Sequence, residues 1–202
     1  DDNYGSELTA YSLATGHRGD LDTLRPYLAS PILQHRCTVL ETPDGRLVAG
    51  TGFGVALALV PAYAVAHAFG LPPEVVLSDR FNQLFAATWG ALAVAFFLAT
   101  MRKLRDPWVA WFSTAAFAFG SSLFSILSRE VWQHSLLILL CAVAVWLLAG
   151  TVPRRDVWKL AAAGFAVGWG MAARPSGILF AIPLAWAAVR YGGRRSAAFF
   201  AA

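Results

Sequence analysis

The chain has 202 residues, of which 57% are hydrophobic and only 14% are charged. A soluble domain averages about 45–50% apolar and about 25% charged residues, so this composition excludes an ordinary soluble domain and indicates a membrane protein. The formal net charge is +4, but nine of the 16 basic residues lie in three short clusters beside uncharged stretches. This clustering favours membrane topology and contact with anionic lipids over nucleic-acid binding. The two cysteines form no disulfide framework and no metal-binding spacing.

Residues 1–46 form the polar part of the chain. Apolar residues at helical spacing predict an amphipathic helix that runs to about Ala14 and is closed by Gly16, namely Tyr4, Leu8, Tyr11 and Leu13. The sequence Thr42-Pro43-Asp44-Gly45 predicts a turn, because proline fixes φ and glycine supplies a positive φ.

The next segment, Leu47–Pro73, carries no charge over 27 residues and is long enough to cross a bilayer. If it crossed, all three basic clusters would lie outside the cell, against the positive-inside rule. The segment is also interrupted by glycines near its start and by Pro61. We therefore expect a helix that lies on the outer membrane face or dips into it. A true span with a weak positive-inside signal is the alternative.

Five further uncharged stretches predict membrane-spanning helices at about residues 80–101, 107–127, 132–150, 157–173 and 176–190. Basic clusters follow the first, third and fifth of them and are expected to face the cytoplasm. Small residues at Gly164, Gly168 and Gly170 predict close helix packing. The predicted fold class is thus an all-α, polytopic transmembrane bundle, with membrane-surface helices in an extracytoplasmic loop at 1–79 and the bundle at 80–202. We expect the chain to be a piece of a longer protein that has a preceding helix and a C-terminal remainder.

This topology gathers ionisable residues on the outer face. They are Asp1, Asp2, Glu7, Asp20 and Asp22 in the loop, Arg129, Glu130 and His134 after the second span, and Arg174 after the fourth. Arginine near the interface is suited to binding phosphate, and a nearby carboxylate can act as a general base. Each residue also has a structural alternative: a solvated loop charge, a helix C-terminal cap for Arg174, or a polar packing residue for His134. The set indicates a phosphate-bearing lipid substrate only when it is taken together.

Several short motifs occur in a recognisable order. They are Asp1-Asp2-x-Tyr4, the Ala10-Tyr11-Ser12-Leu13-Ala14 helix, Arg102-Lys103-Leu104, Ser128-Arg129-Glu130, Trp132-x-His134-Ser135 and Gly168-x-Gly170-x-Ala172-x-Arg174-Pro175. In this order the chain resembles the N-terminal half of integral-membrane glycosyltransferases of the GT-C superfamily. The nearest branch is the dolichyl-phosphate-mannose protein mannosyltransferase and aminoarabinose-transferase type. The chain departs from that pattern in two places: the opening is Asp-Asp where the family often has Asp-Glu, and 48–54 replaces a Tyr-Pro-Pro start.

The resemblance implies a polyprenyl-phosphate sugar donor and an essential acidic residue in the first extracytoplasmic loop. On this basis we expect Asp2, with Asp1 as its neighbour, to deprotonate the hydroxyl of a protein, lipid or glycan acceptor. Arg129 and Arg174, with His134, are expected to bind the donor phosphate, and Glu130 and Asp20 are secondary candidates. The expected reaction is an inverting displacement at the outer face of a bacterial inner membrane. No metal site is predicted, and use of a divalent cation stays open.

Two other classes of function compete with this interpretation. A transporter or flippase would place its site at the membrane midplane between broken helices. A non-catalytic scaffold would not need acids and arginines on one face.

Overall fold

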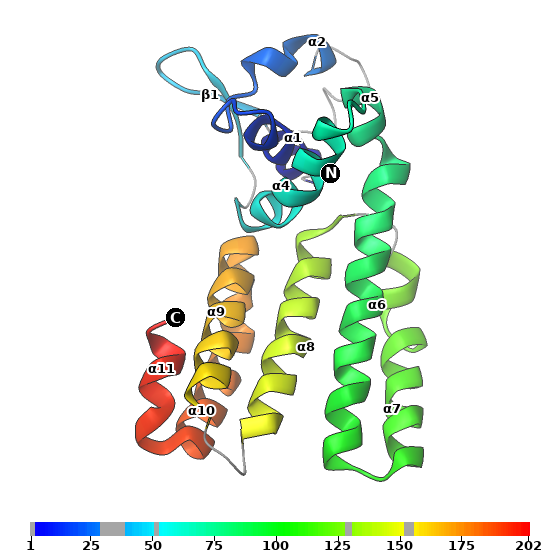
Figure 1. Cartoon of the computed structure of the whole chain (residues 1–202), viewed down its shortest axis with the longest axis vertical. Helices are drawn as coiled ribbons and strands as arrows, with labels where there is room; N and C mark the ends of the chain where they lie inside the picture. The colour runs from blue at the N-terminus through cyan, green and yellow to red at the C-terminus, as the bar shows by residue number, and fades with distance from the viewer. Residues whose placement is uncertain (1–2, 29–38, 51–52, 128–130, 152–155) are drawn as a thin grey trace. The chain divides into compact units, whose positions relative to one another are not determined.

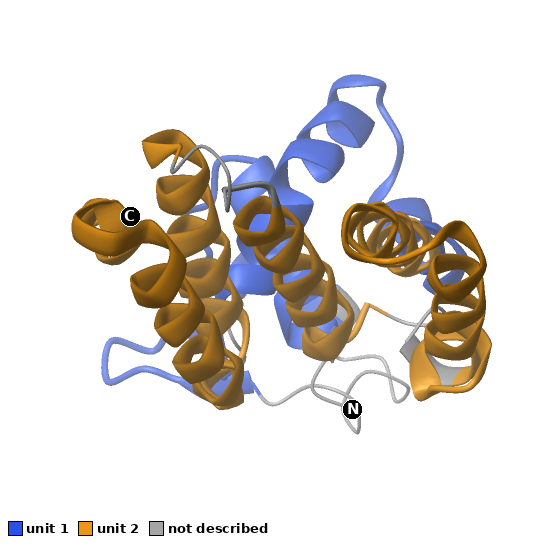
Figure 2. Cartoon of the chain, turned by 90° about the horizontal axis from the view of Figure 1, so that it is seen from below, with its two compact units in different colours: residues 1–84 blue, residues 85–202 orange. Residues whose placement is uncertain are grey.

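The computed structural model describes residues 3–28, 39–50, 53–127, 131–151 and 156–202. It divides into two compact units, residues 1–84 and residues 85–202, shown in separate colours in Figure 2. The first unit holds the polar N-terminal part and the start of the first long helix. The second unit holds the remaining helices.

The N-terminal helix α1 spans Asn3–Ala14 and ends at Gly16, whose φ of +84° places it in the left-handed region. The predicted helix is thus confirmed, but its predicted amphipathic character is wrong. Ser6, Glu7 and Ser12 are buried as well as the apolar side chains, so polar groups of α1 face the protein interior. Two short helical segments follow, η1 (Asp22–Leu24) and α2 (Arg25–Leu28).

A β-hairpin interrupts the predicted all-α fold. Strand β1 (Val39–Glu41) pairs antiparallel with β2 (Leu47–Ala49), with Leu40 opposite Val48. The predicted turn joins them: Gly45 has a φ of +78°, and the Gly45 amide donates to the Thr42 carbonyl at 2.8 Å. The expectation of a single helical segment from residue 47 is therefore wrong for its first three residues.

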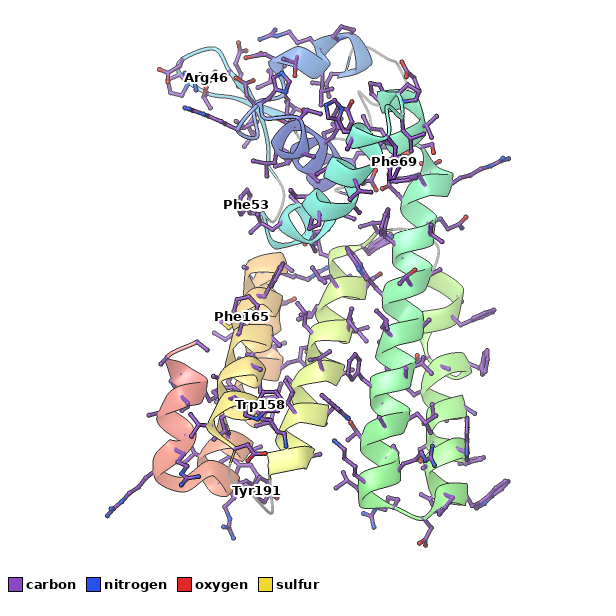
Figure 3. The ribbon with its side chains drawn as sticks, viewed as in Figure 1. Arg46, Phe53, Phe69, Trp158, Phe165 and Tyr191 are labelled. Carbon is purple, nitrogen blue, oxygen red and sulfur yellow. The ribbon has the colours of Figure 1, made fainter. Side chains whose placement is uncertain are left out.

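Helix α4 (Phe53–Ala68) packs against α1, as Figure 1 shows. The side chains of Val55, Leu59 and Tyr63 are buried on one face of α4. On the opposite face, Phe53 and Val65 are more than half exposed, and Phe53 is labelled at the start of α4 in Figure 3. The chain then turns at Gly70 (φ +72°) into the short helix α5 (Pro73–Val76).

The long helix α6 (Asp79–Leu104) begins in the first unit and continues into the second. The other helical elements of the second unit are α7 (Pro107–Phe119), the π-helical turn η2 (Leu123–Leu127), α8 (Gln133–Thr151), α9 (Val157–Ala173), η3 (Pro175–Gly177), α10 (Ile178–Gly192), η4 (Gly193–Ser196) and α11 (Ala197–Phe200). Helices thus occupy all five predicted spans, although the second breaks at Gly120 into α7 and η2. Within the described residues, α6 alone is both long and apolar enough to qualify as a membrane span, and α8 and α9 are shorter apolar helices.

Small residues bring α8, α9, α10 and α11 close together. Their buried core consists of Ala144, Leu147, Leu148, Leu160, Ala163, Ala166, Ala188 and Phe199. A Cβ atom on Gly164 would lie 1.9 Å from the Phe199 carbonyl oxygen, and one on Gly170 would lie 3.0 Å from Leu137 Cδ1. Gly168 has open space around it, so the predicted close approach holds at Gly164 and Gly170 but is wrong at Gly168.

Aromatic contacts connect α6 to its neighbours in the second unit. The rings of Phe97 and Phe117 stack with centroids 4.5 Å apart, which joins α6 to α7. Phe96 meets Trp146 edge-on at 5.3 Å, and Lys103 Nζ lies 4.3 Å from the same indole, which joins α6 to α8. The C-terminal end of α6, which carries Lys103, therefore contacts α8 through the Trp146 ring.

Candidate functional site

Arg174 lies at the end of α9 in an extended backbone conformation (φ −152°, ψ 123°). Pro175 favours this conformation, since a proline disfavours the helical region for the residue before it. The Arg174 amide still donates to the Gly170 carbonyl at 3.0 Å, so the last helical turn is closed. The chain therefore leaves the helical path of α9 at Arg174.

The guanidinium of Arg174 forms hydrogen bonds with one residue of α8 and one residue of η3. Its Nη1 donates to Nε2 of His134, which lies in the first turn of α8, 40 residues earlier in the sequence. Its Nε donates to the Ser176 hydroxyl at 2.9 Å. The structure thus brings together two of the predicted phosphate-binding residues, His134 and Arg174.

This contact fixes the tautomer of His134. Arginine stays protonated in proteins and can only donate, so Nε2 of His134 must accept and a neutral ring carries its proton on Nδ1. The imidazole therefore presents a second donor, Nδ1–H, from the same cluster. Among the described residues no carboxylate pairs with Arg174, whose guanidinium is partly exposed. Within the described part of the chain, the cluster thus offers a guanidinium that no carboxylate pairs with and an imidazole N–H, which suits an anionic group such as a phosphate.

Four of the predicted site residues, Asp1, Asp2, Arg129 and Glu130, lie outside the described residues. The remaining acidic candidate, Asp20, has a local structural role. Its Oδ1 accepts the Asp22 amide at 2.8 Å, and its carbonyl oxygen accepts the Ser12 hydroxyl at 2.5 Å. The carboxylate of Asp20 is thus used to begin η1.

A buried polar cluster in the first unit was not predicted from the sequence. Asn82 Nδ2 donates to Glu7 Oε2 at 2.8 Å, and the Tyr63 hydroxyl donates to Asn82 Oδ1. Burial, together with the nearby Glu7 carboxylate, holds the pKa of the Tyr63 phenol well above its usual range. The Tyr4 hydroxyl donates to Asp79 Oδ1 beside this cluster. The sequence carried no signal that singles out Asn82, because Gln83 is its neighbour and Asp79 and Arg80 lie close by.

The described residues contain no group of three or more His, Cys, Asp or Glu side chains arranged to hold a metal ion. Among the described candidate residues, the structure joins His134 to Arg174, and it joins Glu7 to Asn82.

Comparison with known proteins gives one match. Residues 78–199 match the family described as Dolichyl-phosphate-mannose-protein mannosyltransferase. No curated protein and no solved structure matches the chain. The matched region runs from the residue before α6 into α11, and it includes both His134 and Arg174. It covers well over half of the chain, and the resemblance to GT-C enzymes is confirmed. This chain belongs to the dolichyl-phosphate-mannose-protein mannosyltransferase family, whose type is a membrane glycosyltransferase of the GT-C class.

Proposed function

We propose that this chain carries the donor site and the catalytic base of an enzyme that transfers a sugar from a polyprenyl phosphate to an acceptor hydroxyl. The observation that carries the proposal is the joining of Arg174 and His134 by a hydrogen bond within the region that matches the family. The two side chains would bind the phosphate of the donor, with Arg129 as a further ligand.

The proposed reaction is a direct displacement. Asp2 takes the proton of the acceptor hydroxyl, and the hydroxyl oxygen forms a bond to the anomeric carbon from the face opposite the phosphate. The bond between that carbon and the phosphate oxygen breaks, and the electron pair leaves with the polyprenyl phosphate. Arg174 stabilises the charge that develops on the phosphate, which lowers the barrier more than it stabilises the bound donor. Configuration at the anomeric carbon inverts.

The membrane setting of the proposal is supported by the outer surface of the helices. Large apolar side chains are exposed on α7 and α10, including Trp108, Phe112, Leu179, Ile182 and Trp186. A water-soluble protein rarely exposes so many large apolar side chains, whereas lipid tails solvate them. We propose that these faces contact the bilayer and that the reaction takes place on its extracytoplasmic side.

Two observations support the proposal that α4 lies on that side without crossing. Helix α4 has 16 residues and so is about 24 Å long, which is shorter than a bilayer core of about 30 Å. The Tyr4 hydroxyl also reaches Asp79, so the residues before and after α4 meet. A helix that crossed the membrane would separate these residues by its thickness.

The test uses the full-length protein in liposomes with polyprenyl-phosphate mannose as the donor. Asp2→Asn keeps the shape of the side chain and removes the base, so transfer should fall about 10²–10⁴-fold while donor binding changes little. Asp44→Asn is the matched control, because Asp44 lies in the exposed hairpin turn. It should transfer normally.

Two results would contradict parts of the proposal. If Asp1→Asn and Asp2→Asn both transfer normally while Asp20 or Asp22 is indispensable, the base is wrongly assigned. If no acidic residue within 1–46 matters, the enzyme proposal fails, and transport of a lipid-linked solute becomes the better explanation.

A further inference from the structure

The first turn of α6 is attached to α1 at two points. Tyr4 and Glu7 are three residues apart and therefore lie on one face of α1. Asp79 and Asn82 are also three residues apart, at the start of α6. Tyr4 donates to Asp79, and Asn82 donates to Glu7 at 2.8 Å. These two hydrogen bonds join one face of α1 to one face of α6. Figure 1 shows α1 beside α4 and the beginning of α6.

The second attachment is deeply buried. Glu7 is 5% exposed, Asn82 is 3% exposed and Tyr63 is inaccessible to solvent. The Tyr63 hydroxyl completes the network by donating to the Asn82 carbonyl oxygen, which adds α4 as a third helix. A buried carboxylate or amide that loses its partner keeps its full desolvation cost, so helices joined in this way cannot slide past each other cheaply. Apolar packing alone would permit such sliding, because it has no direction.

The acidic pair lies immediately before this attachment. Asp2 is two residues from Tyr4 and directly precedes α1. Movement of α1 against the first turn of α6 would therefore move Asn3, the residue to which Asp2 is covalently joined. Glu7 itself is too deeply buried to meet an acceptor, so it does not qualify as a base.

We infer that Glu7 and Asn82, supported by Tyr63 and by the Tyr4–Asp79 hydrogen bond, are positioning residues that hold the N-terminal end of α1, which follows Asp2 in the sequence, in place for sugar transfer. This inference rests on the proposed function. A displacement of about 1 Å in a reacting group can reduce a rate by about 10²-fold, so a loosened α1 would slow the reaction step. Donor binding would stay unchanged, since no residue of the attachment belongs to the Arg174 cluster.

The experiment compares substitutions in the full-length protein in liposomes, with polyprenyl-phosphate mannose as donor and with kcat and KM measured separately. Asn82→Ala removes the side chain that joins Glu7 to Tyr63, and kcat should fall about 10- to 100-fold with an unchanged KM for the donor. Glu7→Gln keeps an acceptor oxygen for Asn82, so transfer should stay within about threefold of wild type and the pH profile should not move. Tyr63→Phe should have an intermediate effect on kcat.

Ser12→Ala is the matched control. Ser12 is as deeply buried in the same helix, but its hydroxyl bonds to the Asp20 carbonyl at the other end of α1. The control should lower thermal stability and leave kcat per folded molecule unchanged. Hydrogen exchange gives a readout that needs no donor: amides of residues 4–14 should exchange at least about tenfold faster in Asn82→Ala than in wild type, as expected for local opening.

Three outcomes would overturn the inference. The first is a Glu7→Gln enzyme as inactive as Asp2→Asn with a changed pH profile, which would make Glu7 the base. The second is an Asn82→Ala enzyme that loses stability as Ser12→Ala does and keeps its kcat. The third is unchanged exchange in α1. If the wild-type protein transfers no sugar, the proposed function fails instead, and the exchange measurement still decides whether the attachment exists.

Discussion

Arg174 has two side-chain partners, His134 and Ser176, which hold its guanidinium in one orientation. Arg174→Lys keeps the charge but loses the planar fork, so it cannot keep both partners and bind a phosphate as well. Charge-assisted hydrogen bonds are worth about 1.5–3 kcal/mol each, so kcat/KM for the donor should fall about 10- to 100-fold. Steady-state kinetics in liposomes measure this.

Arg194→Lys serves as the control for Arg174→Lys. Arg194 is exposed in η4, within the basic cluster that we expect to face the cytoplasm, and the substitution should leave kcat/KM unchanged. Equal kinetics for the two variants would exclude Arg174 from donor binding.

At the residue scale, the sequence predicts which side chains share a membrane face but not which of them touch. The positions of the basic clusters predict that His134 and Arg174 lie on one side of the membrane. The structure joins the two side chains by a hydrogen bond. The predicted topology places Glu7 on the same side but does not predict its burial, because a glutamate in a polar segment is normally solvated. Its burial depends on Asn82, 75 residues away, and no local pattern encodes a contact at that separation.

The pairing of α9 with α11 depends on a single missing side chain. Gly164→Ala would place a Cβ 1.9 Å from a backbone carbonyl oxygen of Phe199, which no rotamer change can relieve. The substitution should destabilise the protein by about 1–3 kcal/mol, the usual cost of overpacking. Thermal unfolding in detergent should show a lower midpoint.

Gly168→Ala is the control on the same helix. Its new Cβ would meet nothing within 4 Å, and alanine favours the helix by about 1 kcal/mol over glycine. Its midpoint should be equal to that of wild type or higher. Equal destabilisation by the two substitutions would show that α11 does not pack on Gly164.

The helices were predictable as elements because a bilayer sets a minimum length for an uncharged stretch. The predicted span at 80–101 corresponds to Asp79–Leu104, and that at 157–173 corresponds to Val157–Ala173. The β-hairpin escaped prediction because its strands have three residues each, too few for an alternating pattern to stand out. The break at Gly120 and the π-helical turn after it also gave no signal in the charge pattern, since both halves are uncharged.

For the whole molecule, we predict that the ends of α6 lie on opposite sides of the membrane while the residues that flank α4 lie on one side. Single cysteines can test this in a variant that lacks Cys37 and Cys141. Asp44→Cys and Glu74→Cys should react with a membrane-impermeant maleimide added to intact cells. Arg105→Cys should react only after the membrane is opened, because we expect its basic cluster to face the cytoplasm.

Each labelling result bears on a different part of the topology. Opposite accessibility of the cysteines at 44 and 74 would show that α4 crosses the bilayer. If Arg105→Cys and a further variant, Arg129→Cys, both react in intact cells, the predicted orientation of the spans is wrong.

The contact between Glu7 and Asn82 also constrains how the protein is made. The two residues are 75 positions apart, and ribosomes add about 5–20 residues per second, so Glu7 waits about 4–15 s before its partner is synthesised. During that interval α1 carries a carboxylate that belongs in the interior, and the helix cannot yet bury it favourably. The N-terminal unit can therefore complete its fold only once the start of α6 has emerged. Synthesis of α6 and completion of the N-terminal unit thus become successive steps of one assembly process.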